Sequence, residues 1–135
     1  FRSSTTKVDK EPDIVHIQDF ELIKGVMNKS KSYLNYKFTI SELAMEVGIQ
    51  PYAISNAINT VAKMNYNDFI NSYRIKAFTE KVVSKEYQNY TIEAIANECG
   101  FESKSTFFTA FIKQTGLNPN QYLKKHDMEL KGDES

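Results

Sequence analysis

The side chains best placed for binding chemistry form a short polar run near the start of one predicted helix. Lys104, Ser105 and Thr106 follow Ser103, a residue type that commonly caps helix starts. One ammonium and two hydroxyl groups supply hydrogen-bond donors and acceptors, but the chain has no nucleophile motif, no Gly-rich phosphate loop and no paired His and carboxylate set. The run therefore indicates recognition rather than catalysis, and we expect no enzyme activity.

The residues around this run predict a helix-turn-helix. An apolar face at helical spacing precedes it, ends at Gly100, and consists of Ile92, Ile95, Ala96 and Cys99. In the second helix, we expect Phe107, Ala110 and Phe111 to face inward. The residues on its other faces are Lys104, Ser105, Thr106, Phe108 and Thr109. Two short helices joined by a Gly-containing turn form the motif that places its second helix in the DNA major groove.

The same pattern occurs earlier in the chain. Thr39–Gly48 matches Thr91–Gly100 at an offset of 52 residues in its Thr, Ile, Ala, Glu and Gly, with the apolar Leu43 and Val47 in place of Ile95 and Cys99. Beyond the turn the offset becomes 53, which pairs Ile54, Ala57 and Ile58 with Phe107, Ala110 and Phe111. A single match of this length is a frequent false positive, whereas a repeated one indicates a tandem pair of helix-turn-helix units.

Caps and turns predict the remaining helices. A leading helix from Asp19 carries one apolar stripe, made of Phe20, Ile23, Met27 and Leu34. Thr39 and Glu42 form a capping box at the next helix, and Pro51 suits the first position of the one after it. Lys63 aligns with Gly116, a residue that adopts left-handed backbone readily, so strain is expected at Lys63.

A longer helix, roughly Asp68 to Lys85 and capped by Asn65 or Asn67, is expected to connect the units. Its predicted buried side comprises Phe69, Ile70, Tyr73, Ala77, Phe78 and Val82. A loop follows at 86–90, and Asn118-Pro119 opens a final helix through Lys125, with a frayed, charged end from Asp127.

The predicted fold is all-α, with about seven helices in two helix-turn-helix subdomains joined by a long connecting helix. Five segments are expected: a linker at 1–12, the first unit with its leading helix at 13–65, the connecting helix at 66–85, the second unit at 86–126 and a charged tail at 127–135. The chain lacks an initial Met, and we expect it to be a fragment of a longer protein.

Composition excludes several classes of site. A single cysteine, Cys99, rules out an internal disulfide and a Cys-based metal site, and its position in the apolar face favours a core role. His16 and His126 lie outside both units without a ligand cluster, so we expect surface residues and no metal or cofactor. Seventeen basic residues balance seventeen acidic ones, and residues 39–70 carry one basic and three acidic residues, which predicts weak non-specific DNA binding.

From the tandem repeat onward, the chain resembles the DNA-binding domain of AraC-type transcription regulators over roughly Tyr33 to Lys125. The most specific stretch is IANECGFESKSTFFTAFIKQTGLNPNQY, with its Ile-Ala pair, Gly-Phe turn, Phe-x-x-x-Phe core and terminal Gly, Pro and Tyr. The runs ISNAINTVAKMNYNDFINSYRIKAF and EYQNYTI are similar to a Bacteroidetes-type branch, in which such a domain often ends a larger sensor.

The resemblance implies sequence-specific binding of double-stranded DNA by two recognition helices. It assigns base reading to Tyr52, Ala53, Ser55, Asn56, Lys104, Ser105, Thr106, Phe108 and Thr109. Asn56 and Thr109 replace the Arg of many members, and Phe108 replaces a small polar residue. It also implies a cytoplasmic, monomeric fragment, a parent that can be dimeric or membrane-anchored, a missing N-terminal sensor domain, and RNA polymerase as a further candidate partner.

Simpler interpretations remain open beside these. The polar run can be an ordinary solvated helix face, and Arg74 and Lys76 can contact phosphates or simply form soluble surface. The Ile and Phe stripes are expected to form core rather than a ligand pocket. The main alternative function is a helical protein-protein interaction module with little DNA affinity, which the zero net charge and the acidic first unit would suit.

Overall fold

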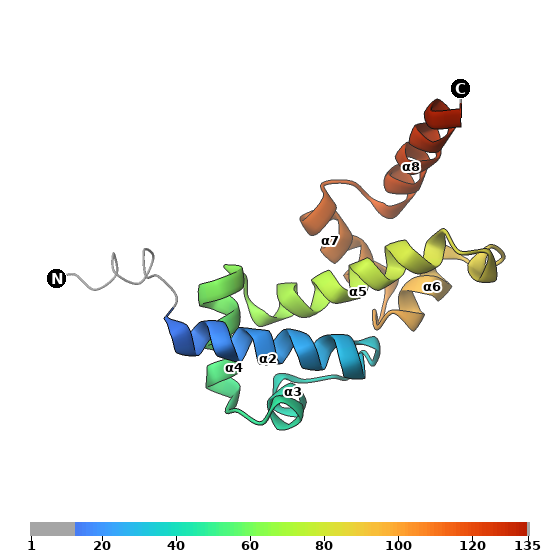
Figure 1. The fold of residues 1–135 in the computed structure, drawn as a ribbon. Helices are drawn as coiled ribbons and strands as arrows, with labels where there is room; N and C mark the ends of the chain where they lie inside the picture. Colours follow the sequence, from blue (N-terminus) through green and yellow to red (C-terminus); the bar gives the residue numbers. More distant parts are fainter. Residues whose placement is uncertain (1–12, 135) are drawn as a thin grey trace. The chain divides into compact units, whose positions relative to one another are not determined.

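The computed structural model describes the backbone of residues 13–134 and the side chains of residues 13–127, all of it helices and connections without a strand. The predicted linker at 1–12 lies outside the described residues. In chain order the elements are α2 (Ile14–Ser30), η1 (Ser32–Leu34), α3 (Ile40–Val47), α4 (Pro51–Ala57), η2 (Ile58–Ala62), α5 (Tyr66–Val82), η3 (Lys85–Tyr87), α6 (Ile92–Glu98), α7 (Lys104–Thr115) and α8 (Pro119–Glu134). The seven α-helices of this part of the chain confirm the predicted all-α class (Figure 1).

The described chain divides into two compact units, and the division falls inside α5. One unit runs to Tyr33 and resumes over Lys37–Ile70, and the other combines Leu34–Tyr36 with the chain from Asn71 onward. Each unit contains one helix-turn-helix, formed by α3 and α4 in the first and by α6 and α7 in the second.

In the first unit, α4 packs on α2, and α3 contacts both (Figure 1). Its fully buried side chains are Ile23, Met27, Leu43, Ile54, Ala57 and Ile58. The predicted capping box starts α3: Glu42 N donates to Thr39 Oγ1 at 3.2 Å, and Thr39 N donates to Glu42 Oε1 at 3.0 Å. Local sequence signals therefore place α3, and burial of the apolar face fixes it against α2 and α4.

The leading helix begins earlier than the sequence prediction. The Asp13 carboxylate caps α2 by accepting from His16 N at 3.0 Å, so Asp19 lies inside the helix rather than at its cap. The early start also brings His16 onto the buried stripe with Phe20, and its side chain is only 16% exposed. The expectation that His16 is a surface residue is therefore wrong.

The leading helix also ends earlier than predicted. Lys31, with φ of 54°, turns the chain into the left-handed region, and a short turn of 3₁₀ helix, η1, follows. Leu34 consequently leaves the stripe of α2 and packs against the core of the second unit. Glu46 of α3 accepts from Ser30 Oγ at 2.9 Å and from Ser32 Oγ at 2.7 Å, which holds the end of α2.

The connecting helix α5 is shifted from its predicted bounds of 68–85. Asn65 provides the cap, because its Oδ1 accepts from Asp68 N at 2.8 Å. The helix stops at Val82, and Ser84 caps the 3₁₀ turn η3 where a plain loop was expected. Ile75 is buried although it was not in the predicted buried face, whereas Tyr73, Ala77 and Val82 are only partly buried.

A polar relay holds η3 in the second unit. Lys81 Nζ donates to Tyr87 Oη at 3.1 Å, and Tyr87 Oη donates to Glu98 Oε1 at 3.0 Å. The hydrogen bond with Tyr87 raises the pKa of Lys81. Side chains of α5, η3 and α6 are thereby joined around one phenol, which explains the ordered turn in a stretch with few apolar residues.

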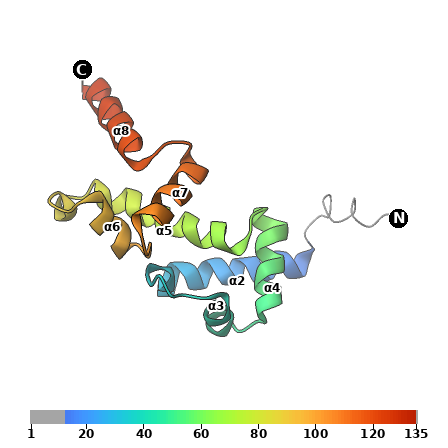
Figure 2. The same ribbon diagram turned by 180° about the vertical axis from the view of Figure 1, so that it is seen from behind.

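Four phenylalanines dominate the second core: Phe78, Phe101, Phe107 and Phe111. Phe107 lies centrally, with its ring centroid 4.7 Å from that of Phe78, 5.1 Å from that of Phe101 and 5.6 Å from that of Phe111. The other members of the cluster are Ile75, Ile95, Ala96, Cys99 and Ala110. Burial of Ile95, Ala96 and Cys99 confirms most of the predicted apolar face, whereas Ile92 is only partly buried. Figure 2 shows α6 and α7 as neighbouring helices. Gly100 lies in the turn between them.

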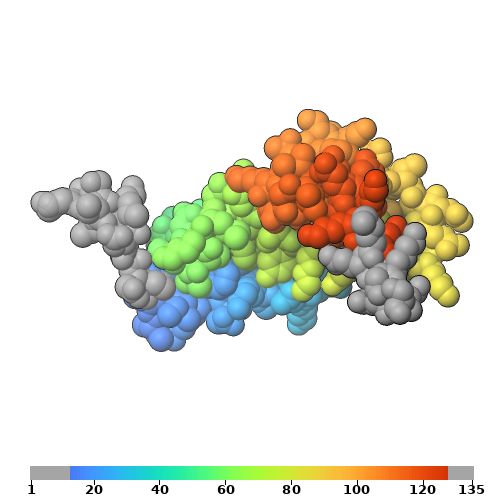
Figure 3. All heavy atoms as spheres, turned by 90° about the horizontal axis from the view of Figure 1, so that it is seen from above, coloured from blue at the N-terminus to red at the C-terminus, as the bar shows by residue number. Residues whose placement is uncertain are grey.

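The last helix is longer than predicted. Asn118 caps it by accepting from Gln121 N at 2.8 Å, and Pro119 is its buried first residue, as expected. The helix does not end at Lys125 but continues to Glu134. Neither Pro nor Gly occurs between Asn120 and Lys131, which favours continued helix, and the fraying expected from Asp127 stays a prediction. Figure 3 shows the first part of α8 adjoining α7. Tyr122 of α8 packs against the ring of Phe111 of α7.

Candidate nucleic-acid interface

The start of α7 presents the polar run of Lys104, Ser105 and Thr106 to solvent. Ser103 caps the helix: Thr106 N donates to Ser103 Oγ at 3.1 Å, and the two hydroxyl oxygens hydrogen-bond at 2.9 Å. Lys104, Ser105 and Thr106 are all exposed. Because the cap fixes the first turn, these three side chains have a defined position on the surface, and the next residue, Phe107, packs in the core.

The opposite side of α7 is fully committed to packing. Phe107 and Phe111 are 0% exposed and Ala110 is 7% exposed, which confirms the predicted inward face. Thr109 is exposed. The helix therefore has one face that holds it in the unit and one that meets solvent, as a helix that enters a DNA groove requires.

Phe108 lies between these two faces. Its ring meets Phe107 edge to face at 5.7 Å and 84°, and the Lys104 ammonium stands 5.4 Å from the ring centroid. The side chain is only half-buried, so part of the ring remains available beside the exposed face. Packing on Phe107 limits how far this ring can move toward a ligand.

The corresponding helix of the first unit, α4, begins at Pro51 as predicted, after Gln50, whose side chain makes no capping bond. Tyr52 is 70% exposed and Asn56 is also exposed, whereas Ala53 and Ser55 are half-buried. The four predicted base readers of this unit therefore divide into two that project outward and two that lie at the edge of the packed face.

The end of α4 differs from the end of α7. Residues 58–62 form a turn of π-helix, η2, in which Thr60 Oγ1 donates to the Asn56 carbonyl oxygen at 2.6 Å. Side-chain bonding to the carbonyl four residues earlier competes with the backbone bond there. Lys63 then adopts φ of 59°, which confirms the left-handed conformation expected from its alignment with Gly116, whose φ is 80°.

The two predicted phosphate contacts have different surroundings. Arg74 is half-buried, and its guanidinium donates from Nη2 to the carbonyl oxygen of Asn35, the residue directly after η1, at 3.1 Å. Lys76 is exposed. Of the pair, the lysine is the residue whose charge is presented to solvent.

Two positions on these faces are missing from the set assigned by sequence. Asn59 and Ile112 are exposed and correspond at the offset of 53 residues. Extending the repeat by one further turn along both helices would have found them. The predicted set of base-reading residues omits them because it is confined to the first turns of the two helices.

The remaining sites of potential chemistry have structural explanations. Burial raises the pKa of the Cys99 thiol to about 11, which leaves it protonated and unreactive at neutral pH, as its predicted core role requires. Within the described residues, no group of three His, Cys, Asp or Glu side chains is arranged to hold a metal ion. His126 is half-buried rather than on the open surface as predicted.

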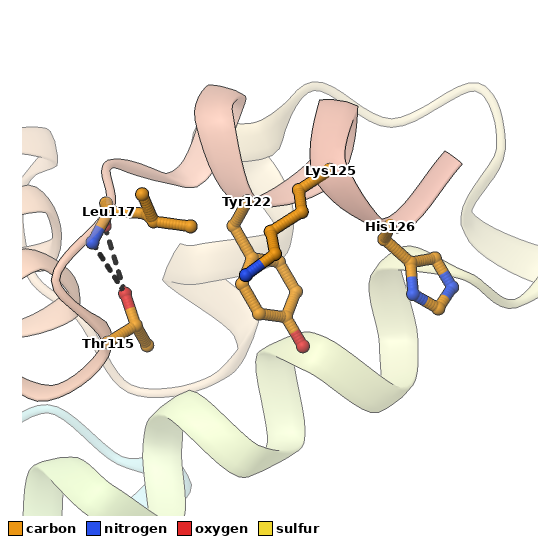
Figure 4. A pocket seen from close by; sticks show the side chains of 5 residues that line it. All are labelled: Thr115, Leu117, Tyr122, Lys125 and His126. Carbon is orange, nitrogen blue, oxygen red and sulfur yellow. Dashed lines mark hydrogen bonds between the residues drawn. The ribbon is translucent and has the colours of Figure 1, made fainter. Parts of the chain in front are cut away.

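A shallow hollow of about 180 Å³ lies at the junction of α7 and α8. It is lined by Thr115, Leu117, Tyr122, Lys125 and His126 (Figure 4). The Thr115 hydroxyl is within donating distance of the carbonyl oxygens of Phe111 and Leu117, and it accepts from Leu117 N at 3.2 Å. The bonds between Thr115 and Leu117 stabilise the turn between the two helices (Figure 4).

Comparisons with known proteins agree with this architecture. A family model described as a helix-turn-helix domain matches residues 43–125, more than half of the chain. The chain therefore belongs to this helix-turn-helix family, and its type is the AraC-type DNA-binding domain. The family is a DNA-binding regulatory family rather than an enzyme family, which gives DNA-binding transcription regulation as the class of function.

Two solved structures share the fold. The C-terminal domain of AraT, a response regulator from Geobacillus stearothermophilus, is similar with a TM-score of 0.62 and 21% identity, over 84% of this chain and 86% of that chain. A protein of unknown function from Listeria innocua is similar with a TM-score of 0.61 and 20% identity, over 76% and 94%. A comparison with curated proteins finds no match.

No helix within the described part of the chain combines the length and apolar character needed to cross a membrane.

Proposed function

We propose that this chain binds double-stranded DNA sequence-specifically, with α4 and α7 as recognition helices in successive major grooves. One observation carries the proposal: both helices bury the same register positions and leave the others exposed or half-buried, so each unit has a packed side and a readable side. The proposed base-reading residues are Tyr52, Ala53, Ser55, Asn56, Lys104, Ser105, Thr106, Phe108 and Thr109.

The chemistry of these residues matches base edges in the major groove. An Asn side chain can pair with the N6 and N7 positions of adenine, and Lys can donate to O6 and N7 of guanine. Asn56 and Lys104 are exposed and would fill these roles, while the hydroxyls of Ser105 and Thr106 can pair with either kind of base. The exposed Lys76 would contact a phosphate.

The charge balance predicts how strongly DNA binding should depend on salt. The chain carries 17 basic and 17 acidic residues, so we expect counterion release to contribute less to the affinity than it does in a strongly basic domain. Base contacts must then provide a larger share than in a strongly basic domain. We infer modest non-specific affinity and a shallow salt dependence, with the selected site bound far more tightly.

One chain would cover both grooves without dimerising, because the repeat supplies two recognition helices. Grooves that face the same side of DNA repeat about every 34 Å. A longer parent regulator would add a sensor domain and contacts with RNA polymerase, and could itself dimerise.

Fluorescence anisotropy with a random-sequence duplex and with a site selected from a random library tests the proposal. Binding should weaken between roughly 50 and 200 mM salt, and the selected site should be preferred by at least about a thousandfold. Hydroxyl-radical footprinting of the isolated chain should show two protected patches about one helical turn apart. Absence of any salt-dependent binding would favour the protein-interaction alternative, and a single protected patch would contradict the two-groove arrangement.

A further inference from the structure

The solvent face of α7 is less polar than its first turn. Ser105, Phe108, Thr109 and Ile112 are spaced i, i+3, i+4 and i+7, the pattern that places side chains on one face of a helix. No member of this face is charged. Ile112 is 45% exposed although the core beneath α7 is closed by the fully buried Phe107 and Phe111.

Phe108 gives this face a fixed apolar element. Its ring is held edge to face against Phe107 at 5.7 Å and lies below the Lys104 ammonium at 5.4 Å. Ile112 stands one helical turn further along, four residues from Phe108. An aromatic ring and a β-branched aliphatic side chain, both with few accessible rotamers, thus continue the reading face beyond its hydroxyl groups.

The major groove offers one apolar group to such a face. Among the base edges exposed there, only thymine carries a methyl group, at C5, and apolar side chains recognise it by contact. Arginine, which contacts guanine best, is absent from α7. From this face we infer that α7 reads thymine methyl groups through Ile112, with Phe108 as its support, so that the DNA it contacts there contains A·T pairs. The inference rests on the proposed DNA binding and specifies what one helix reads.

The first unit provides a control at the matching position. Asn59 corresponds to Ile112 at the offset of 53 residues and is likewise exposed, but it is an amide rather than an aliphatic group. A response to thymine methyl groups that depends on Ile112 should therefore be independent of Asn59.

Replacing thymine by uracil in the selected duplex tests the inference, since uracil lacks only the C5 methyl and keeps the same hydrogen-bonding edge. Each thymine is replaced singly, and dissociation constants are measured for the whole chain, for Ile112→Ala and for Asn59→Ala. At one or more thymines the unchanged chain should bind the uracil duplex about fourfold more weakly, equivalent to about 0.8 kcal/mol for one buried methyl group. Ile112→Ala should lose this thymine-to-uracil ratio, and Asn59→Ala should keep it.

Melting temperatures of the variants verify that the fold is intact. If Ile112→Ala lowers the melting temperature, Ile112→Val removes one methylene and should reduce the ratio by a smaller factor. A ratio of one at every thymine in the unchanged chain, or a ratio that persists in Ile112→Ala, would overturn the inference while leaving DNA binding intact. Failure to bind any duplex would instead overturn the proposed function, so the two failures are distinguishable.

Discussion

The two helix-turn-helix units share their buried positions and differ on their exposed ones. Ile54, Ala57 and Ile58 in the first unit and Phe107, Ala110 and Phe111 in the second are buried at the same register. On the outer faces, a phenol, a hydroxyl and two amides in the first unit correspond to two hydroxyl and two apolar side chains in the second: Tyr52, Ser55, Asn56 and Asn59 against Ser105, Phe108, Thr109 and Ile112, of which Ser55 and Phe108 are half-buried and the others exposed. Packing constrains the scaffold, because a change in the core alters volume and contacts, whereas the outer face can diverge.

The ends of the two recognition helices show the same separation between geometry and residue type. Both copies of the repeat reach a residue with left-handed backbone twelve positions after the first residue of the recognition helix. These residues are Lys63 after Pro51 and Gly116 after Lys104. The first unit reaches it through the π-helical turn η2, and the second through regular α-helix. The left-handed backbone at the end of each helix is therefore required by the turn that follows, whereas the residue type at that position differs between the two units.

The largest loss of stability should come from a core position that both units share, occupied by Phe107 in the second unit and by Ile54 in the first. Phe107→Ala should destabilise the chain by about 3–5 kcal/mol, because it removes a ring that contacts four other aromatic side chains and leaves a cavity. The aligned Ile54→Ala should cost about 2–5 kcal/mol. Thermal and urea unfolding monitored by circular dichroism measures both. Loss of less than about 1 kcal/mol at Phe107 would contradict its central place in the core.

The next effect concerns readout without folding. Thr106→Ala gives the second unit the residue that the first unit already has, Ala53, at the aligned position. Ser103 still accepts from the backbone N–H of residue 106, so stability should stay within about 0.5 kcal/mol. Discrimination should fall by about 1–3 kcal/mol at one base pair, measured by competition between the selected site and its single-base variants. Equal weakening on all sequences would argue against base reading by this hydroxyl.

A smaller effect should appear at the left-handed helix ends. Lys63→Gly should leave the free energy of unfolding unchanged or raise it by up to about 1 kcal/mol, since φ of 59° is unfavourable for a residue with a Cβ atom. The reverse change, Gly116→Lys, should cost about 1 kcal/mol, although a Cβ atom there would meet no neighbour within 4 Å. Urea unfolding of both variants gives the comparison, and a clear loss in Lys63→Gly would show that the lysine side chain is itself stabilising.

The smallest effect at neutral pH is expected where Cys99 aligns with Val47. Cys99→Val should change stability by less than about 1.5 kcal/mol at pH 7, because the two side chains have similar size and polarity. Burial raises the folded-state pKa of this thiol to about 11, so as pH rises the thiol of the unfolded chain ionises first. The unchanged chain should therefore lose stability between about pH 9 and 11 relative to the valine variant. Parallel unfolding curves at pH 7 and pH 10 would reveal this divergence, and its absence would mean that the folded thiol ionises normally.

Local signals in the sequence were sufficient where short-range geometry decides the structure. The capping box at Thr39, the cap at Ser103, the first-turn Pro51 and Pro119 and the strained Lys63 all concern bonds within a few residues. The inward faces of α6 and α7 were also predicted, because the repeat of apolar residues at 3.6-residue spacing identifies a buried side without knowledge of its partner.

Features that depend on distant contacts needed the tertiary structure. Leu34 continues the apolar period of α2 but joins the second core, because Lys31 turns the chain away first. Arg74 resembles an available phosphate ligand in sequence, yet its guanidinium donates to the carbonyl oxygen of Asn35, 39 positions earlier in the chain. The ordered turn η3 depends on Tyr87, whose partners Lys81 and Glu98 belong to two different helices.

By itself, the sequence determined the helical class, the tandem repeat, most caps and the polar first turn of α7, since each is set by residue spacing or by a bond within one turn. Only the tertiary structure decided which side chains at the edges of the apolar stripes are covered, where α2 and α5 end, and that Ile112 remains exposed beside a closed core. Periodicity gives the direction in which a side chain points along a helix, but solvent exposure depends on which segment packs there, and that is a long-range property.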